Sequence, residues 1–127
     1  MMKKKILIVE DNADLLKVLQ LLLKDSYEPI LAMKGREAVD IAAAERPDLI
    51  LLDIVLPDMN GLEIARLLRQ HPETQSMPIL AMTAKVSRID EEDCILSGCD
   101  DFIAKPFTFE QLVPRIEKLL NQSNHQS

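Results

Sequence analysis

The sequence predicts an α/β fold, in which a parallel sheet is covered by helices on both faces. Apolar runs alternate with segments of helical spacing five times along the 127 residues. The runs recur at intervals of twenty to thirty residues, which suits right-handed crossovers between parallel strands. Nearly half of the residues are apolar (47%), enough for one substantial core. We expect one domain over residues 1–121 and a polar, disordered tail over residues 122–127.

Five segments are predicted to be strands. Residues 4–9 and 49–52 are continuous apolar runs, which is typical of parallel strands buried on both faces. Residues 29–32 form a weaker strand, and Pro29 favours an edge position because proline cannot donate to a neighbouring strand. The fourth and fifth strands are expected at residues 78–82 and 102–104.

The first two helices are predicted from apolar spacing and from their ends. Residues 13–24 carry leucines at helical spacing, and Asn12 can cap the first turn. Residues 36–46 are rich in alanine, and Pro47 stops the helix there.

The other three helices have sequence signals at one or both ends. Asn60 and Glu63 form a capping box for a helix that runs to about residue 70. Residues 87–96 form an acidic helix, and Gly98 suits the turn that follows it. A second capping box at residues 108–111 opens a helix that runs to about residue 120. Pro114 inside this helix predicts a kink or a displaced start.

Composition restricts the classes of function. A net charge of −6 and few aromatic residues (3%) disfavour direct binding to nucleic acid, which requires a basic surface or rings for base stacking. No apolar run is long enough to span a bilayer or to form a signal peptide. Cys94 and Cys99 are too few for a disulfide framework or a zinc site. We therefore expect a cytoplasmic protein with reduced thiols and with no membrane or nucleic-acid partner.

Four of the predicted strands run directly into residues that can bind a metal ion or a phosphoryl group. The first strand is followed by Glu10 and Asp11, the third by Asp53, the fourth by Thr83 and the fifth by Lys105. Each residue alone has a commoner explanation, such as a turn or an exposed lysine. In a parallel sheet, however, all these strand ends lie at one edge, where open α/β folds place their ligand sites.

The combination of side chains points to phosphoryl transfer. Carboxylates that converge on one edge repel one another, and Mg²⁺ relieves this repulsion because it prefers oxygen ligands. Lys105 supplies a positive charge for an anion, and Thr83 supplies a hydroxyl group. Such a site mainly positions groups and neutralises charge. A carboxylate is itself a competent acceptor and forms an acyl phosphate.

The segments ILIVEDN, LILLDIVLPDMNGLE, PILAMTA and GCDDFIAKPF resemble the receiver domain of two-component response regulators, including its single-domain, chemotaxis-type members. The resemblance runs in order from about Lys4 to Leu120. It implies a flavodoxin-like, doubly wound sheet of five parallel strands in the order 2-1-3-4-5, with helices on both faces. Because no effector domain follows, we expect either a stand-alone receiver or a piece of a longer chain.

The resemblance implies a phosphoacceptor and a metal site. Asp53 would receive a phosphoryl group from a histidine kinase or a histidine phosphotransfer protein. Glu10, Asp11, Asp53 and the backbone carbonyl of Val55 would hold Mg²⁺. Glu10 stands where many members of the family have aspartate, so its reach toward the metal differs by one methylene group.

The resemblance also implies residues that sense the phosphoryl group. Lys105 and Thr83 would bind it, and Thr83 and Phe102 would act as the switch. Phe102 cannot donate the hydrogen bond that a tyrosine at this position would offer. The peptide bond between Lys105 and Pro106 would be cis, which is uncommon.

The favoured function is a phosphorylation-controlled signalling switch that changes its surface for a downstream effector, rather than a turnover enzyme. One alternative is a receiver-like protein-interaction module that works without phosphorylation, and the complete set of site residues argues against it. Another is a Mg²⁺-dependent phosphohydrolase, for which the sequence shows neither a second acid/base nor a substrate cap. A dinucleotide-binding domain is disfavoured because the turn after the first strand lacks a glycine-rich loop.

Asp100, Asp101 and Arg115 partly match receivers that dimerise through the last strand and helix. We expect a monomer or a weak, phosphorylation-dependent dimer.

Overall fold

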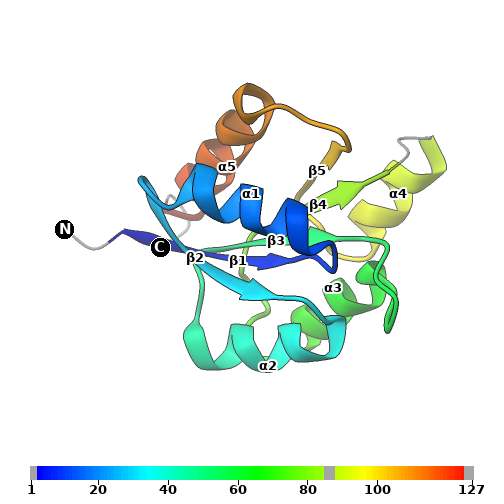
Figure 1. Ribbon diagram of the computed structural model, residues 1–127. Helices are drawn as coiled ribbons and strands as arrows, with labels where there is room; N and C mark the ends of the chain where they lie inside the picture. Colours follow the sequence, from blue (N-terminus) through cyan, green and yellow to red (C-terminus); the bar gives the residue numbers. More distant parts are fainter. Residues whose placement is uncertain (1–2, 85–87, 125–127) are drawn as a thin grey trace.

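The computed structural model describes residues 3–84 and 88–124, in which strands and helices alternate along the chain (Figure 1). The elements are β1 (Lys4–Val9), α1 (Ala13–Leu23), β2 (Tyr27–Ala32), α2 (Gly35–Glu45), β3 (Leu49–Asp53), α3 (Gly61–Gln70), β4 (Ile79–Thr83), α4 (Arg88–Leu96), β5 (Asp101–Ala104) and α5 (Phe109–Asn124).

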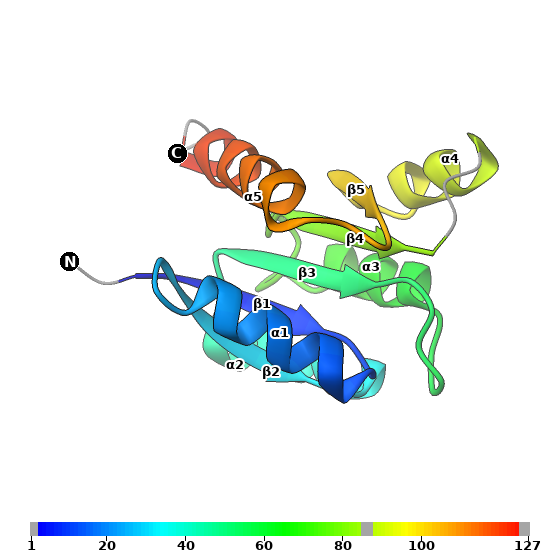
Figure 2. The same ribbon diagram turned by 45° about the horizontal axis from the view of Figure 1, so that its top comes forward.

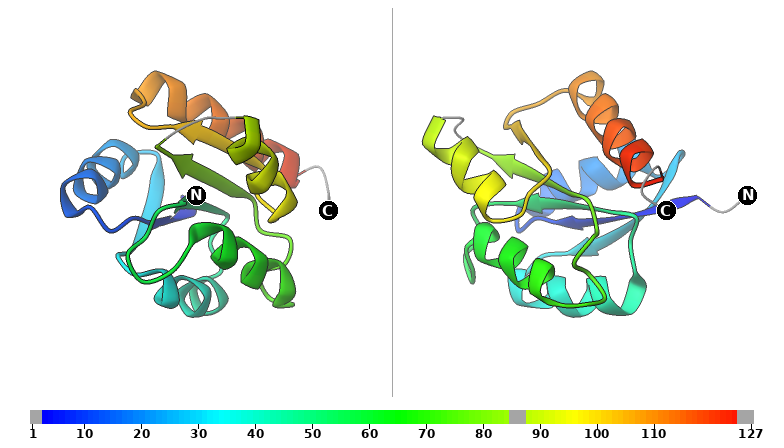
Figure 3. Two further views of the ribbon diagram at one scale, coloured as in Figure 1. Left: turned by 90° about the vertical axis from the view of Figure 1, so that its right-hand side faces the viewer. Right: turned by 180° about the vertical axis from the view of Figure 1, so that it is seen from behind.

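The sheet is parallel throughout, with the strand order β2-β1-β3-β4-β5. Helices α1 and α5 cover one face, and α2, α3 and α4 lie on the other, so the sheet is doubly wound (Figures 2 and 3). The structure therefore confirms the predicted α/β class, the flavodoxin-like order and the helices on both faces.

Two hydrophobic cores lie on opposite faces of the sheet. One core joins the sheet to α1 and α5 through residues such as Leu19 and Ile116, and the other joins it to α2 and α3 through residues such as Ala42 and Ile64. The central strands contribute alternate side chains to both cores: Ile50 and Leu52 to one, Leu49 and Leu51 to the other. This explains why β1, β3 and β4 read as continuous apolar runs rather than as alternating patterns.

Element bounds differ from the predictions where a strand or helix lacks a clear sequence signal. β2 begins two residues earlier than expected, at Tyr27, and Pro29 is accommodated because β2 is an edge strand. β5 begins one residue early, at Asp101. The predicted first residue of α4, Ser87, lies outside the described residues. Helix α5 continues to Asn124, four residues beyond its predicted end at about residue 120.

Helix starts agree well with the predicted caps. The Asn12 side chain accepts hydrogen bonds from the amides of Asp14 and Leu15 at the start of α1, and the Asn60 side chain accepts one from Leu62 in α3. In the second capping box the Thr108 amide donates to Gln111 Oε1 (2.9 Å) and the Gln111 amide donates to Thr108 Oγ1 (3.2 Å).

Two further features of the described chain bear on the sequence predictions. Pro114 lies inside α5, and the start of the helix is not displaced, since the capping box fixes it. Within residues 3–84 and 88–124, no helix combines the length and apolar character needed to cross a membrane.

Candidate functional site

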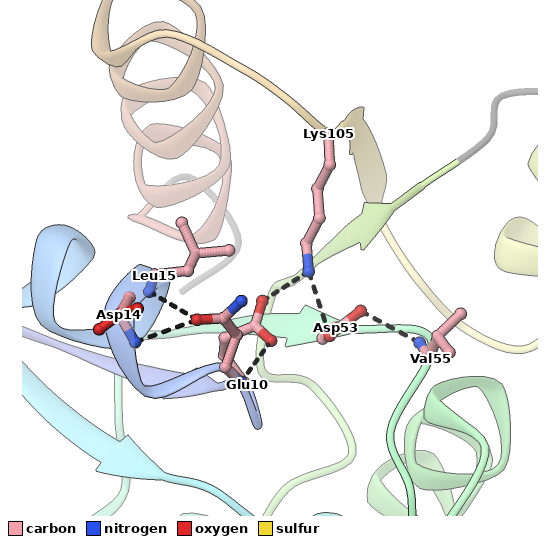
Figure 4. Close-up of polar contacts among 7 residues, drawn as sticks. Glu10, Asp14, Leu15, Asp53, Val55 and Lys105 are labelled. Atoms are coloured by element: carbon pink, nitrogen blue, oxygen red, sulfur yellow. Dashed lines mark hydrogen bonds and ion pairs between the residues drawn. The ribbon is translucent and has the colours of Figure 1, made fainter.

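The carboxyl ends of the strands bring the predicted site residues to one edge of the sheet. Val9 pairs with Leu52 across β1 and β3, and Thr83 pairs with Ala104 across β4 and β5. Glu10 and Lys105 directly follow β1 and β5, whereas Asp53 and Thr83 are the last residues of β3 and β4. All four therefore lie at the same edge of the sheet, as open parallel sheets require. Figure 4 shows Glu10, Asp53 and Lys105 pointing toward one another from three different strand ends.

An ammonium group and two carboxylates form the centre of the site. Lys105 Nζ lies 2.5 Å from Glu10 Oε1 and 3.1 Å from Asp53 Oδ2. Glu10 is 1% exposed and Asp53 is 4% exposed, whereas the Lys105 side chain is 23% exposed. Charges this deeply buried persist only when they are paired. Lys105 thus pairs with both carboxylates and offsets one of their two negative charges.

The surroundings keep Lys105 in its charged form. Burial by itself lowers the pKa of this ammonium group, but the hydrogen bond to Glu10 and the negative charge of Asp53 outweigh it. The pKa of Lys105 therefore lies above its usual value, and the side chain is a fixed positive charge at neutral pH.

Backbone amides hold the two buried carboxylates in place. The Asn12 amide donates to Glu10 Oε2 (3.1 Å), and the Val55 amide donates to Asp53 Oδ1 (3.1 Å). Each carboxylate is therefore bound on one oxygen by the backbone and on the other by Lys105 (Figure 4). Such bonds restrict the rotation of both side chains and prepare the site for a ligand.

The loop after β3 approaches the site very closely, and this requires Gly61. The Gly61 amide donates to the Ile54 carbonyl (2.8 Å), and a Cβ atom at Gly61 would clash with the Asp53 carbonyl oxygen. Any other residue would push the start of α3 away from Asp53. Glycine here is thus a packing requirement of the site.

Three carboxylates offer a ligand set for a divalent cation. One oxygen each of Glu10, Asp11 and Asp53 lies within 4.8 Å of the others, and Asp11 is exposed while its neighbours are buried. All the donors are oxygen atoms, the cluster opens to solvent on the Asp11 side, and Mg²⁺ prefers a few carboxylate oxygens together with water. The residues present therefore fit Mg²⁺.

The two predicted switch residues differ in burial and position. Thr83 is 5% exposed at the end of β4, and its carbonyl accepts the Lys105 amide (2.6 Å). Phe102 is only partly buried and packs against the core on the α4 side of the sheet. The Lys105–Pro106 peptide bond is cis, in agreement with the expectation.

Two charged residues, Asp58 and Arg69, hydrogen-bond to the backbone of segments that are distant in the sequence. These contacts were not predicted from the sequence. Asp58 accepts hydrogen bonds from the amides of Gly35 and Arg36, which are more than twenty positions away in the chain. Arg69, near the end of α3, donates hydrogen bonds to four residues. The acceptors are the carbonyls of Gln75, Met77 and Gly98 and the carboxylate of Asp100. These bonds connect the end of α3 to the segments that precede β4 and β5. Neither role has a local sequence signal, because the partners meet only in the fold.

The charges at the last strand and helix are paired within the chain. Arg115 Nη1 lies 3.1 Å from Asp101 Oδ1 and also donates to the Phe102 carbonyl (3.0 Å). Arg69 Nη2 lies 2.8 Å from Asp100 Oδ2. The three residues noted for a dimerising face therefore already have intramolecular partners.

Comparison with known proteins gives consistent results. The profile of the response regulator receiver domain matches residues 6–117. The polar-differentiation response regulator DivK of Brucella anthropi is 38% identical over 123 residues, which cover 96% of this chain and 100% of that protein.

Two solved structures show similar folds. A response regulator receiver domain protein from Methanospirillum hungatei is 27% identical, with a TM-score of 0.91 over 98% of this chain and 99% of its own. The receiver domain of a sensor histidine kinase from Pseudomonas aeruginosa, solved with a magnesium ion coordinated in its active-site cleft, is 32% identical. Its TM-score is 0.87, over 94% of this chain and 98% of its own.

Proposed function

The chain belongs to the response regulator receiver family of two-component systems, and from this premise we propose that it is a phosphorylation-controlled switch whose phosphoacceptor is Asp53. The donor is a phosphohistidine on a histidine kinase or a histidine phosphotransfer protein. The phosphorylated form presents a changed surface to a downstream effector protein. We propose a cytoplasmic location, since the donor and the buried thiols both suit a reducing compartment.

One observation carries this proposal: Lys105 contacts Asp53 and Glu10 at the same time. Asp53 is one of the two carboxylates that contact the lysine, and it ends β3, the middle strand of the sheet. Its Oδ1 is bound by the Val55 amide, while its Oδ2 faces the ammonium group. An added phosphoryl group at Asp53 would therefore meet a positive charge at once.

The proposed reaction transfers one phosphoryl group without oxidation or reduction. A carboxylate oxygen of Asp53 forms a bond to phosphorus while the bond from phosphorus to the histidine nitrogen breaks. The imidazole keeps the electron pair of that bond and takes a proton from solvent. Lys105 stays protonated and compensates the charge of the transferred group. Because the product remains on the chain, the protein is a phosphoacceptor and not a turnover enzyme.

The metal requirement follows from the ligand set. Glu10, Asp11, Asp53 and the backbone carbonyl of Val55 would hold Mg²⁺, which when bound supplies positive charge that offsets repulsion between the phosphoryl group and the carboxylates. Backbone amides hold the carboxylates of Glu10 and Asp53, so two of the ligands need little reorganisation.

A hollow beside the site supports docking of a protein donor. It has a volume of about 380 Å³ and is lined by Leu15, Lys105, Pro106 and Phe107. Apolar side chains continue from it along the outer face of α1, where Val18 is 49% exposed. An apolar surface next to Lys105 suits a partner that must bring its phosphohistidine to Asp53 and then leave.

Signal output would begin at Thr83. Its hydroxyl group moves toward the phosphoryl oxygens, and Phe102 repacks on the α4 side of the sheet. The partly buried position of Phe102 supports this, because a ring that is not locked in the core can change its packing. We expect the protein to be a monomer or a weak, phosphorylation-dependent dimer.

Phosphorylation with a small donor tests the proposal. The protein is incubated with acetyl phosphate, with and without Mg²⁺, and its intact mass is measured. We expect one added phosphoryl group that depends on Mg²⁺ and is absent in Asp53→Asn. Asp101→Asn is the matched control, since it removes a carboxylate that pairs with Arg115 outside the site. An undiminished adduct in Asp53→Asn would place the acceptor at another residue.

A further inference from the structure

We propose that Asp58 is a positioning residue for the metal and phosphoryl site: it fixes the loop of residues 54–60 by capping the amino terminus of α2. The part of this inference that concerns Mg²⁺ affinity rests on the proposed function. The part that concerns the position of the loop does not.

Helix α2 has no cap of its own. Lys34 occupies the capping position and makes no side-chain hydrogen bond to the first turn. The amides of Gly35 and Arg36 donate instead to Asp58, at 3.0 Å to Oδ1 and 3.1 Å to Oδ2. A carboxylate is favoured at a helix amino terminus because the helix dipole is positive there. Asp58 is thus a cap supplied from a distant loop.

The cap holds Asp58 in two directions. Both carboxylate oxygens of Asp58 accept hydrogen bonds from the first turn of α2. The Arg36 guanidinium lies 3.9 Å from Oδ2, and the Asp58 side chain is only 20% exposed. The two backbone hydrogen bonds and the nearby guanidinium keep the pKa of Asp58 below its ordinary value. A bidentate contact restricts rotation as well as distance.

The capped loop carries one proposed metal ligand and supports another. Val55 lies three positions before Asp58, and its amide donates to Asp53 Oδ1. A bridge between Val55 and Asn60 closes the loop, and the Gly61 amide bonds to the Ile54 carbonyl at its base. The Val55 side chain is 69% exposed, so these backbone bonds rather than packing determine where its carbonyl lies.

The segment that Asp58 caps is also linked to Glu10, through β2. Helix α2 follows directly from β2, whose last carbonyl, that of Ala32, accepts the Glu10 amide (3.0 Å). Two proposed metal ligands that follow different strands, Glu10 after β1 and Val55 after β3, are therefore joined through β2, the start of α2 and Asp58. A change at Asp58 should move one ligand relative to the other, although Asp58 itself is not a ligand.

The experiment compares Asp58→Ala, Asp58→Asn and the control Glu37→Ala. Glu37 is an exposed acidic residue in the first turn of α2, so its removal changes the charge at the same helix end without touching the loop. Three quantities are measured on each folded protein: the Mg²⁺ dissociation constant from amide chemical shifts, the metal-free amide shifts and exchange rates of Val55 and Gly61, and the urea unfolding midpoint.

We expect Asp58→Ala to weaken Mg²⁺ binding about tenfold, in the range known for residues that orient metal ligands. Asp58→Asn keeps one oxygen acceptor and should lie between the parent and Asp58→Ala. If Asp58→Ala does not fold, Asp58→Asn carries the test. Glu37→Ala should bind Mg²⁺ as the parent does. In metal-free protein the Val55 and Gly61 amides should shift and exchange faster in the Asp58 variants alone.

A merely stabilising cap would give a different result. A lower unfolding midpoint with unchanged Mg²⁺ binding and unchanged Val55 and Gly61 signals would overturn the proposal. If the parent protein did not bind Mg²⁺, the proposed metal site would fail, and the metal-free signals of Val55 and Gly61 would still decide whether Asp58 positions the loop.

Discussion

At Lys105, one ammonium group faces two carboxylates that are almost fully buried. Three charges withdrawn from water lose much of their hydration, and ion pairs of this kind often contribute little to stability. Apolar side chains of similar volume would fill the same space at lower cost. Glu10, Asp53 and Lys105 are therefore better explained by the chemistry of the site than by the stability of the fold.

In the proposed mechanism Thr83 transmits phosphorylation rather than receiving the phosphoryl group. Its hydroxyl group carries no charge and is not the proposed acceptor, so Thr83→Ala should still be phosphorylated at Asp53. The variant should fail to transmit the change, because a phosphoryl group shifts a two-state equilibrium only through contacts that differ between the states.

Amide spectra with and without a phosphoryl mimic such as beryllofluoride test this prediction. The parent protein should shift near Asp53 and also across α4, β5 and α5, whereas Thr83→Ala should shift mainly near Asp53. Equal shifts across α4, β5 and α5 in both proteins would refute the role of Thr83.

Cys99 should be unreactive in the folded protein. Burial, followed by the neighbouring Cys94, raises the pKa of the Cys99 thiol to about 12, and the residue is 5% exposed. At pH 8 only about one thiol in ten thousand would be ionised, and the thiolate is the reactive form. Iodoacetamide should therefore label Cys99 in urea but not in the native protein. Labelling of native protein at the rate of a free thiol would contradict this environment.

Helices α1, α3 and α5 begin where local sequence signals place them, and this explains why their starts were predictable. Asn12, Asn60 and the pair Thr108 and Gln111 act within one turn of themselves, so the sequence alone indicates their partners. The start of α2 depends on Asp58, which comes from another loop and was not predictable. The end of α5 was placed too early because its last residues are polar and carry no stop signal.

The capping box of α5 should contribute measurably to stability. Thr108→Ala removes the acceptor for the Gln111 amide and should lower the free energy of unfolding by about 1 kcal/mol. Lys118→Ala, an exposed change later in the same helix, is the control and should have little effect. Urea unfolding of both variants gives the comparison. Equal values for the two variants would show that the box does not hold the helix start.

For the whole molecule, alternation of strand and helix predicted a parallel sheet, but it did not predict the strand order. The order came from resemblance to the receiver family, since the physical rules leave several doubly wound arrangements open. Convergence of Glu10, Asp53 and Lys105 was predictable because carboxyl ends share one edge. The contact of Lys105 with both carboxylates was not, because it depends on side-chain rotamers.

The stability of the whole molecule should respond to Mg²⁺ through the acidic cluster. A ligand that binds only the folded state stabilises it by about 1.4 kcal/mol at ten times its dissociation constant, which corresponds to a rise of about 3 to 6 °C in Tm for a domain of this size. Asp11→Ala should be at least as stable as the parent without metal, because it relieves repulsion, and should respond weakly to Mg²⁺.

Thermal unfolding of the parent, Asp11→Ala and Asp25→Ala checks this prediction. Asp25 is an exposed carboxylate beyond the carboxyl end of α1, outside the acidic cluster, so its variant should respond to Mg²⁺ like the parent. An equal rise in all three proteins would mean that Mg²⁺ binds elsewhere.

The sharing of one core between α1 and α5 has a consequence for synthesis on the ribosome. The nascent chain grows by about 5 to 20 residues per second, and β1, α1 and β2 emerge long before α5. Until α5 arrives, Leu49 and Leu51 of β3 lack the helix that covers them in the finished protein. A chain stalled before Phe109 would thus expose an apolar face of the sheet, to which chaperones can bind. This face is buried only after α5 has left the ribosome and packed against it.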